Sequence, residues 1–264
     1  MTDDVVRVFI GGTKEHFLPS RVLEYSIRKY CSGEVHVIHI HGLLETGYPQ
    51  FEIPVPQDPK HQPVTSFSFK RFLVPMFCHY SGKGIYLDSD QLVLHDIRDM
   101  WNTPFPPGTN VLNSGGWQSA VMLIDCKKAL WDIAVLVHQI DKGELTYSKM
   151  MNLRGSFASV AGSLGAEWNR MDNIEHPCKL LHYTNMRKQP WLCSTHPYSS
   201  KWVSHLMQAI GEGFITKEDV HDEIEAGHVR PSLMALFYSD ITYQQMAKMD
   251  KGFVFPDDKR KKKK

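Results

Sequence analysis

Short apolar runs alternate with amphipathic segments along most of the chain, which predicts the α/β fold class. The apolar runs have the pattern of buried strands and comprise residues 5–10, 34–40, 84–87, 119–124 and 179–183. The amphipathic segments space apolar residues as helices do and comprise residues 19–30, 66–80, 127–140, 202–210 and 217–226. Between them, residues 42–64 are rich in proline and glycine and are predicted to form a loop.

Residues 5–40 give the clearest prediction of how these elements are arranged. A strand, a helix and a second strand follow one another there, which is a βαβ unit. Such a unit places its strands in parallel and covers the sheet with helices. We therefore predict one α/β domain with a mainly parallel sheet over residues 1–210. Residues 211–258 are predicted to form a C-terminal extension packed on it, followed by a basic tail at 259–264.

The composition is that of a folded protein, and its charge is unevenly divided. Of the 264 residues, 42% are hydrophobic and 22% are charged, which excludes a disordered chain. Lys and Arg number 30 against 29 Asp and Glu, but six of the basic residues lie in the tail at 259–264. Residues 1–258 thus carry 24 basic and 29 acidic groups, a net charge of −5. This mildly acidic body argues against a sequence-independent nucleic-acid-binding protein, which needs a broad basic face.

Several features predict a cytoplasmic protein. No apolar run approaches the ~20 residues of a membrane-spanning helix, and the N-terminus lacks the pattern of a secretory signal. The five cysteines are scattered, which fits reduced thiols better than disulfides or a structural zinc site. The basic tail has three interpretations: a solvated end, a contact with an anionic membrane surface, or a nuclear signal.

The strongest local signal for chemistry is the segment IYLDSD at residues 85–90. Here an apolar strand ends in two carboxylates, Asp88 and Asp90, at the edge of the sheet where open α/β folds bind ligands. Two hard oxygen ligands on one turn suit Mg²⁺ or Mn²⁺ carrying a diphosphate. Because Asp-x-Asp triplets also occur as solvated acids in loops, the triplet alone leaves both interpretations open.

His182 adds a second element to the metal-site hypothesis. It lies near the end of the predicted strand at 179–183 and is followed by Lys188 and Trp191. A strand-end imidazole can complete a metal site begun by two carboxylates, and a lysine can pair with a phosphate oxygen. The alternative is a histidine satisfied in the core or on the surface, since the chain has 14 histidines.

Several motifs occur in the order of a known family over residues 5–203. They are VFIGGTKE, FSFKRFLVP, IYLDSD, QSAVMLIDC, EWN and HYTNMRKQPW. In this ordered set the chain resembles the GT-A fold glycosyltransferases of family 8, which include glycogenin and bacterial lipopolysaccharide galactosyl- and glucosyltransferases. The resemblance implies a Rossmann-like α/β/α sandwich with a C-terminal helical extension.

The resemblance also implies roles for individual residues at the donor. The implied ligands of a divalent metal are Asp88, Asp90 and His182. Arg71 would reach the donor sugar and the diphosphate. The remaining implied donor-binding positions are Ile10, Gly11 and Gly12 at the base, with Glu15 nearby, and Ser89, Asn185 and Lys188 toward the diphosphate.

Three further positions are implied around the donor sugar. Gln118 stands where the family has an asparagine facing the sugar, and Asn169 matches the Asn of a Trp-Asn pair. Asn152 lies in the segment 152–159, where the family offers an acid or amide beside the anomeric carbon, but this segment has no carboxylate. The chain also departs from the family at Asn185, which replaces a glycine, and in a Pro-Trp pair that lies one residue farther from His182.

Together these observations predict a metal-dependent hexosyltransferase with a nucleotide-sugar donor, a UDP-sugar foremost. The resemblance implies retention of anomeric configuration, and the lack of a carboxylate nucleophile favours a same-face displacement. Glycan, lipid-linked and protein acceptors remain alternatives. So do two other function classes: a non-catalytic nucleotide-sugar-binding or scaffold protein, and a nucleotidyl- or phosphotransferase that uses the same pair of aspartates.

Overall fold

The computed structural model describes residues 5–65, 67–115, 118–238 and 242–254. Its centre is a six-stranded sheet with strand order β2-β1-β3-β6-β5-β7. The strands are β1 (Val6–Gly11), β2 (Val35–His39), β3 (Lys83–Asp88), β5 (Val111–Leu112), β6 (Val121–Asp125) and β7 (Val160–Ala161). β1 pairs in parallel with β2 and β3, and β5 with β7, whereas β6 runs antiparallel to both neighbours. The predicted α/β class with a mainly parallel sheet is confirmed.

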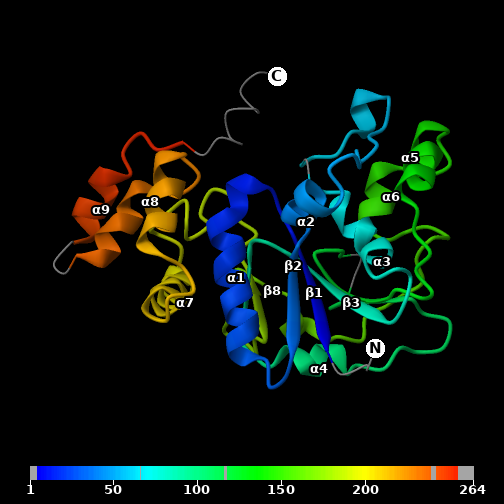
Figure 1. The fold of residues 1–264 in the computed structure, drawn as a ribbon, viewed down its shortest axis with the longest axis horizontal. Helices are drawn as coiled ribbons and strands as arrows, with labels where there is room; N and C mark the ends of the chain where they lie inside the picture. Colours follow the sequence, from blue (N-terminus) through cyan, green and yellow to red (C-terminus); the bar gives the residue numbers. More distant parts are fainter. Residues whose placement is uncertain (1–4, 66, 116–117, 239–241, 255–264) are drawn as a thin grey trace.

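The predicted βαβ unit is present, and its helix is buried on two sides. α1 (Phe17–Tyr30) connects β1 to β2. The helix lies between the central sheet and the C-terminal helices (Figure 1). Leu23 and Ile27 share a hydrophobic cluster with the sheet, whereas Leu18 and Val22 share one with the C-terminal helices. This double contact explains why the apolar residues of α1 cover more of its surface than the single stripe of an ordinary surface helix.

A second, smaller sheet brings distant segments together. Its strand order is β4-β9-β8, and the strands are β4 (Gln91–Val93), β8 (Arg170–Met171) and β9 (Leu180–His182). β4 begins directly after Asp90, and its first residue, Gln91, is opposite His182 in the antiparallel pairing with β9. The pairing therefore places the turn that carries the two aspartates against the strand that ends in His182.

Helices cover both faces of the large sheet. α2 (Ile40–Gly47), α3 (Val74–Phe77), α5 (Ile133–Asp141) and α6 (Tyr147–Met151) share a hydrophobic cluster with one face. α4 (Ile97–Trp101) covers the other face together with α1. The alternation of strand residues separates the two clusters: Phe9 and Tyr86 belong to the first, Ile10 and Ile85 to the second.

Two of the predicted segments differ from the structure near α2 and α3. Residues 42–64 were expected to form a loop, but α2 begins at Ile40 and a 3₁₀ helix, η2, spans Pro59–His61. Glycines at 42 and 47 made the sequence of α2 resemble a loop. In the structure its buried Ile40 and partly buried Leu44 pack on the core. The helix predicted at 66–80 is instead a 3₁₀ helix, η3 (Lys70–Leu73), joined to α3, with Pro75 in the first turn of α3.

The helix predicted at 127–140 begins later than expected. α5 starts at Ile133 because Asp132 caps it: its carboxylate accepts hydrogen bonds from Ala134 N and Val135 N. The short elements β5, β7, β8 and α6, and the helix α9 (Tyr243–Met249), were not predicted. Each is too short to show a clear hydrophobic period.

The C-terminal segment packs on α1. α7 (Ser199–Gly211) and α8 (Lys217–Glu225), with a 3₁₀ helix η5 (Pro231–Phe237), share one hydrophobic cluster with α1 and β9. Figure 1 shows α7, α8 and α9 gathered beyond α1, on the side away from α5 and α6. None of the helices in the described part of the chain is long and apolar enough to cross a membrane. The basic tail at 259–264 lies outside the described residues.

Candidate active site

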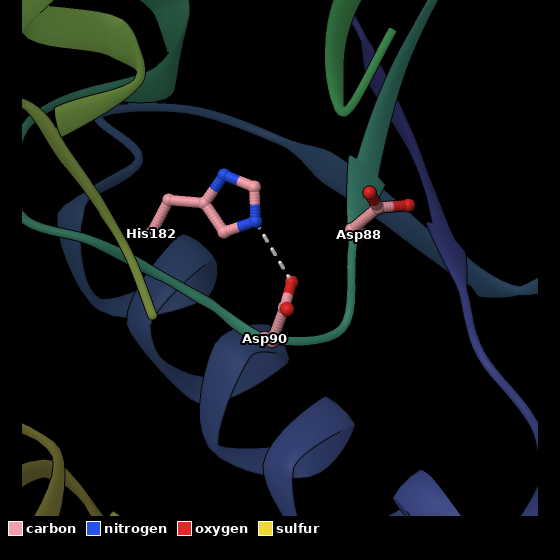
Figure 2. Close-up of side chains that lie close together, drawn as sticks. All are labelled: Asp88, Asp90 and His182. Carbon is pink, nitrogen blue, oxygen red and sulfur yellow. Dashed lines mark ion pairs between the residues drawn. The ribbon is translucent and has the colours of Figure 1, made fainter. Parts of the chain in front are cut away.

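Asp88, Asp90 and His182 lie together at the end of the central strands. Each offers one ligand atom, and these atoms are all within 4.8 Å of one another. Asp88 ends β3, Asp90 follows on the next turn, and His182 ends β9, with its Nε2 facing Asp90 (Figure 2). His182 Nε2 is 3.1 Å from Asp90 Oδ1. The structure thus brings together the three residues predicted as metal ligands.

Main-chain hydrogen bonds from three neighbouring segments hold the aspartate turn. Ser89 N donates to Gly11 O at 3.0 Å, and Asp88 N donates to Ala120 O at 3.1 Å. Tyr183 N donates to Asp90 O at 2.9 Å. The ends of β1, β6 and β9 therefore fix the turn before any ligand binds.

The charges at this turn fit a divalent cation. Burial and the neighbouring Asp90 carboxylate raise the pKa of Asp88, although the Arg71 guanidinium opposes the rise. Asp90 Oδ1 is shielded from water and accepts no well-aligned hydrogen bond from the described residues. Two carboxylates and one imidazole form a ligand set that accepts Mn²⁺ or Mg²⁺, and a cation between them would relieve the repulsion.

An amide chain orients the imidazole of His182. His182 Nδ1 lies 2.8 Å from Asn169 Oδ1, and Asn169 Nδ2 donates to Gln118 Oε1 at 2.5 Å. Because the amide oxygen accepts, Nδ1 carries the proton and Nε2 is directed at Asp90. Burial lowers the pKa of His182, but the Asp90 carboxylate raises it more, to a value above the usual one. Gln118 is thereby linked through Asn169 to the cluster of Asp88, Asp90 and His182.

Arg71 places a buried positive charge beside Asp88. Its side chain is 7% exposed, and Nη2 is 3.1 Å from Asp88 Oδ1. Nη1 donates to Ser119 Oγ at 2.6 Å, and Nε donates to Ser68 O at 3.1 Å. Tyr86 also donates from its hydroxyl to Asp88 Oδ1 at 2.6 Å. The guanidinium is thus held in place at the edge of the carboxylate pair.

A cavity of about 730 Å³ opens next to this cluster. Its lining comes from the end of β1, from α1, from the start of α2 and from the region of α8, and includes Ile10, Gly12, His39, His41, Glu223 and His228. A Cβ on Gly12 would lie 3.3 Å from Ser89 Cβ, so the cavity begins at the turn between the two aspartates. Its volume is in the range of small-molecule and cofactor sites.

Glycine is required at Gly11, the last residue of β1. A Cβ on Gly11 would lie 2.0 Å from the Tyr86 hydroxyl oxygen.

Lys70 is a site residue that sequence reasoning missed. It is 7% exposed and donates from Nζ to Gly12 O at 2.8 Å. Burial lowers the pKa of Lys70 to about 8. Its position directly before Arg71 in the motif FSFKRFLVP was the signal that could have identified it.

The loop after β9 carries two of the remaining predicted residues on the surface. Asn185 and Lys188 are exposed, and Asn185 N donates to Asp172 Oδ2 at 3.2 Å. Glu15 is partly buried in a 3₁₀ helix, η1 (Lys14–His16), next to the end of β1. The contacts of these three residues with a donor stay a prediction.

Asn152 follows α6, and its amide is occupied within that helix. Asn152 Nδ2 donates to Ser148 O at 2.8 Å. The preceding residue, Met151, accepts a hydrogen bond from Ser119 Oγ at 2.6 Å. Because Ser119 also binds Arg71, the end of α6 lies beside the Arg71 network. The role of Asn152 at an anomeric carbon stays a prediction.

Comparisons with known proteins agree with this fold. No protein-family model matches the sequence. A segment of 47 residues is 47% identical to part of the glycosyltransferase 8 domain-containing protein 1 of Xenopus tropicalis. This match covers 18% of the chain and only 13% of that relative. It bears out the resemblance seen in the motifs over a short stretch.

Solved structures match over most of the chain. The galactosyltransferase LgtC, in complex with donor and acceptor sugar analogues, matches with a TM-score of 0.54 at 13% identity, over 80% of this chain and 100% of that one. GlyE from Streptococcus pneumoniae TIGR4 matches with a TM-score of 0.53 at 17% identity, over 80% of this chain and 63% of that one. The bifunctional glycosyltransferase WbbM matches with a TM-score of 0.53 at 12% identity, over 85% of this chain and 52% of that one. The chain therefore has the GT-A glycosyltransferase fold and spans between half and two thirds of GlyE and WbbM.

Proposed function

We propose that this protein is a metal-dependent glycosyltransferase that transfers a hexose or related sugar from a nucleotide sugar, a UDP-sugar foremost, to an acceptor. The observation that carries the proposal is the cluster of Asp88, Asp90 and His182, with Arg71 beside it. A cavity of about 730 Å³ lies close by, since Gly12 in its lining approaches Ser89 between the two aspartates. The names of the matching relative and structures, all glycosyltransferases, support the reaction class.

The residues divide the work of stabilising a diphosphate leaving group. A divalent cation held by Asp88, Asp90 and His182 would act as a Lewis acid on the diphosphate. Arg71, already desolvated by the fold, adds a fixed positive charge next to the same position. Lys188, exposed on the loop after β9, can reach the diphosphate as a mobile point charge.

The cavity beside the cluster is the proposed site of the nucleoside. Ile10 supplies an apolar surface at the wall of the cavity. Gly12 has no side chain, which lets its backbone lie close to Ser89 in the aspartate turn. Glu223 and His228, which lie after residue 210, line the same cavity. The C-terminal extension thus contributes to the proposed donor site.

The proposed stereochemical course is retention by same-face displacement. Residues 152–159 contain no carboxylate that could form a glycosyl intermediate, and Asn152 is bound to its own helix. The bond from the anomeric carbon to the diphosphate oxygen breaks, the acceptor oxygen bonds to the same face, and its proton passes to the leaving phosphate. A trapped glycosyl-enzyme adduct in the mass spectrum, or an inverted product linkage, would overturn this course.

The activity is tested by release of UDP from a panel of UDP-sugars in the presence of Mn²⁺. We expect release with at least one sugar, and its loss after addition of EDTA and in Asp90→Asn. Asp58→Asn is the matched control, because Asp58 caps the short helix η2 and asparagine caps equally well. Tight binding of UDP-sugars without turnover, across all donors and acceptors tried, would favour a non-catalytic binding protein instead.

A further inference from the structure

Gln189 is buried beside the proposed metal ligands, and its side chain joins two of their segments. It is 6% exposed. Its Nε2 donates to Asp90 Oδ2 at 3.1 Å and to Tyr183 O at 2.9 Å. Gln189 lies between Lys188 and Pro190, on the segment that follows His182.

The two oxygens of Asp90 are in different environments because of this amide. Oδ2 accepts the hydrogen bond from Gln189, whereas Oδ1 faces His182 and accepts no well-aligned hydrogen bond from the described residues. An amide donor fixes the carboxylate without adding a positive charge that would repel a cation. Arg71, by contrast, binds Asp88.

Main-chain hydrogen bonds also hold Gln189 in place. Its main-chain oxygen accepts hydrogen bonds from Leu192 N at 2.8 Å and Cys193 N at 2.9 Å. Replacing the amide should therefore leave the loop backbone in place and remove only the two donor contacts. This makes the contribution of the side chain measurable apart from the fold.

We infer that Gln189 is a positioning residue for the metal: its amide turns Asp90 Oδ1 toward the cation and ties the aspartate turn to the strand that ends in His182. The inference rests on the metal site of the proposed function. Hydrogen-bond partners of metal ligands commonly change metal affinity by about 10–100-fold when they are removed.

The test compares two variants of the same loop in the full-length chain. Gln189→Met keeps the length and volume of the side chain but lacks the amide. Thr184→Val is the control, because Thr184 lies on the same loop as Gln189 and also makes a side-chain hydrogen bond. Its hydroxyl donates to Asp172, which is not one of the proposed metal ligands. Free Mn²⁺ is measured by its electron paramagnetic resonance signal during titration of the protein, with and without UDP, and thermal melting reports folding.

We expect Gln189→Met to bind Mn²⁺ about 10–100-fold more weakly than the wild type, and Thr184→Val to stay within about threefold. Affinity within threefold of the wild type in Gln189→Met, or an equal loss in both variants, would overturn the inference. If Gln189→Met does not fold, Gln189→Asn, whose shorter amide does not reach Asp90, must show the same loss. A wild type that binds no Mn²⁺ under either condition would overturn the metal site itself, which is a different result.

Discussion

Two buried acidic groups of this protein differ in how much positive charge surrounds them. Glu24, on α1, is a single carboxylate with three partners. Its Oε2 is 2.6 Å from Arg21 Nη1 and 2.8 Å from His39 Nε2, and its Oε1 is 2.9 Å from Arg28 Nη2. Burial alone would raise the pKa of Glu24, but these three partners outweigh burial and lower the pKa to about 2. Positive groups outnumber the carboxylate, so the cluster is complete without a ligand.

The group at Asp88 and Asp90 has one positive partner for each carboxylate: Arg71 for Asp88 and His182 for Asp90. Burial and Asp90 raise the pKa of Asp88, whereas His182 lowers the pKa of Asp90. Both groups are buried and hydrogen-bonded, so burial alone does not distinguish them. The difference is that Glu24 has three partners for one carboxylate, and the smaller share of positive charge at Asp88 and Asp90 suits a group proposed to bind a cation.

The largest expected effect comes from removing one carboxylate of the pair. We expect Asp90→Asn to reduce UDP release by at least about 100-fold, since a charged group of the proposed metal site is lost. Its free energy of unfolding should fall by no more than about 1 kcal/mol, because the lost ion pair with His182 is offset by the lost repulsion with Asp88. Urea denaturation measures the second quantity, and a marked loss of stability would show that the pair is structural, like Glu24.

Glu24→Gln should show the opposite pattern. Two guanidinium groups and His39 would lose their carboxylate, and we expect a loss of about 2 kcal/mol in the free energy of unfolding. Because Arg21 and His39 also line the proposed nucleoside cavity, any effect on UDP release should appear in KM, with kcat retained in the folded fraction at 25 °C. Glu34→Gln is the matched control, because Glu34 pairs with His36 on the surface, where such pairs contribute little. Equal stability of the two variants would remove the contrast.

The pH dependence of stability sharpens the same comparison. Because the pKa of Glu24 falls from 4.5 to about 2 on folding, its contribution is complete above pH 4.5 and is lost as the pH falls toward 2. The difference in urea midpoint between the wild type and Glu24→Gln should therefore be constant near neutral pH and shrink below 4.5. A difference that grows on acidification would contradict this account.

The smallest effect is expected at Tyr86. Tyr86→Phe removes the hydroxyl that donates to Asp88 but leaves Arg71 in place. The loss of about 1 kcal/mol corresponds to a reduction of kcat/KM for UDP release of about fivefold. A loss as large as that of Asp90→Asn would mean that the hydroxyl, rather than the balance of charge, determines the state of Asp88.

The parts of the site that the sequence predicts are those carried by single elements. The apolar strand before Asp88 and Asp90, and the strand that delivers His182, are both visible as local patterns. Strand-end position predicted where each ligand lies along the chain. Their meeting depends on the second sheet, in which the antiparallel pairing of β4 with β9 places His182 opposite Gln91, next to Asp90.

The contacts that orient these ligands could not be predicted in the same way. Asn169 and Gln118 are 51 residues apart, and Gln189 and Asp90 are 99 residues apart. Amide side chains have no periodic signal, so only the folded chain shows which of them meet. The helix α2 was missed for a different reason: glycines at 42 and 47 indicated a loop, but burial of Ile40 and Leu44 against the core outweighed that local preference.

The cluster that joins α1 to the C-terminal helices has a consequence for how this chain can be divided. Leu18 and Val22 pack with Val220 and Leu233, across the predicted boundary at residue 210. A chain cut at that boundary would expose this apolar surface and lose the wall of the cavity that contains Glu223. If the cavity is the donor site proposed above, chimeras that exchange this end between glycosyltransferases of this fold would exchange part of that site, and donor preference should change with the graft.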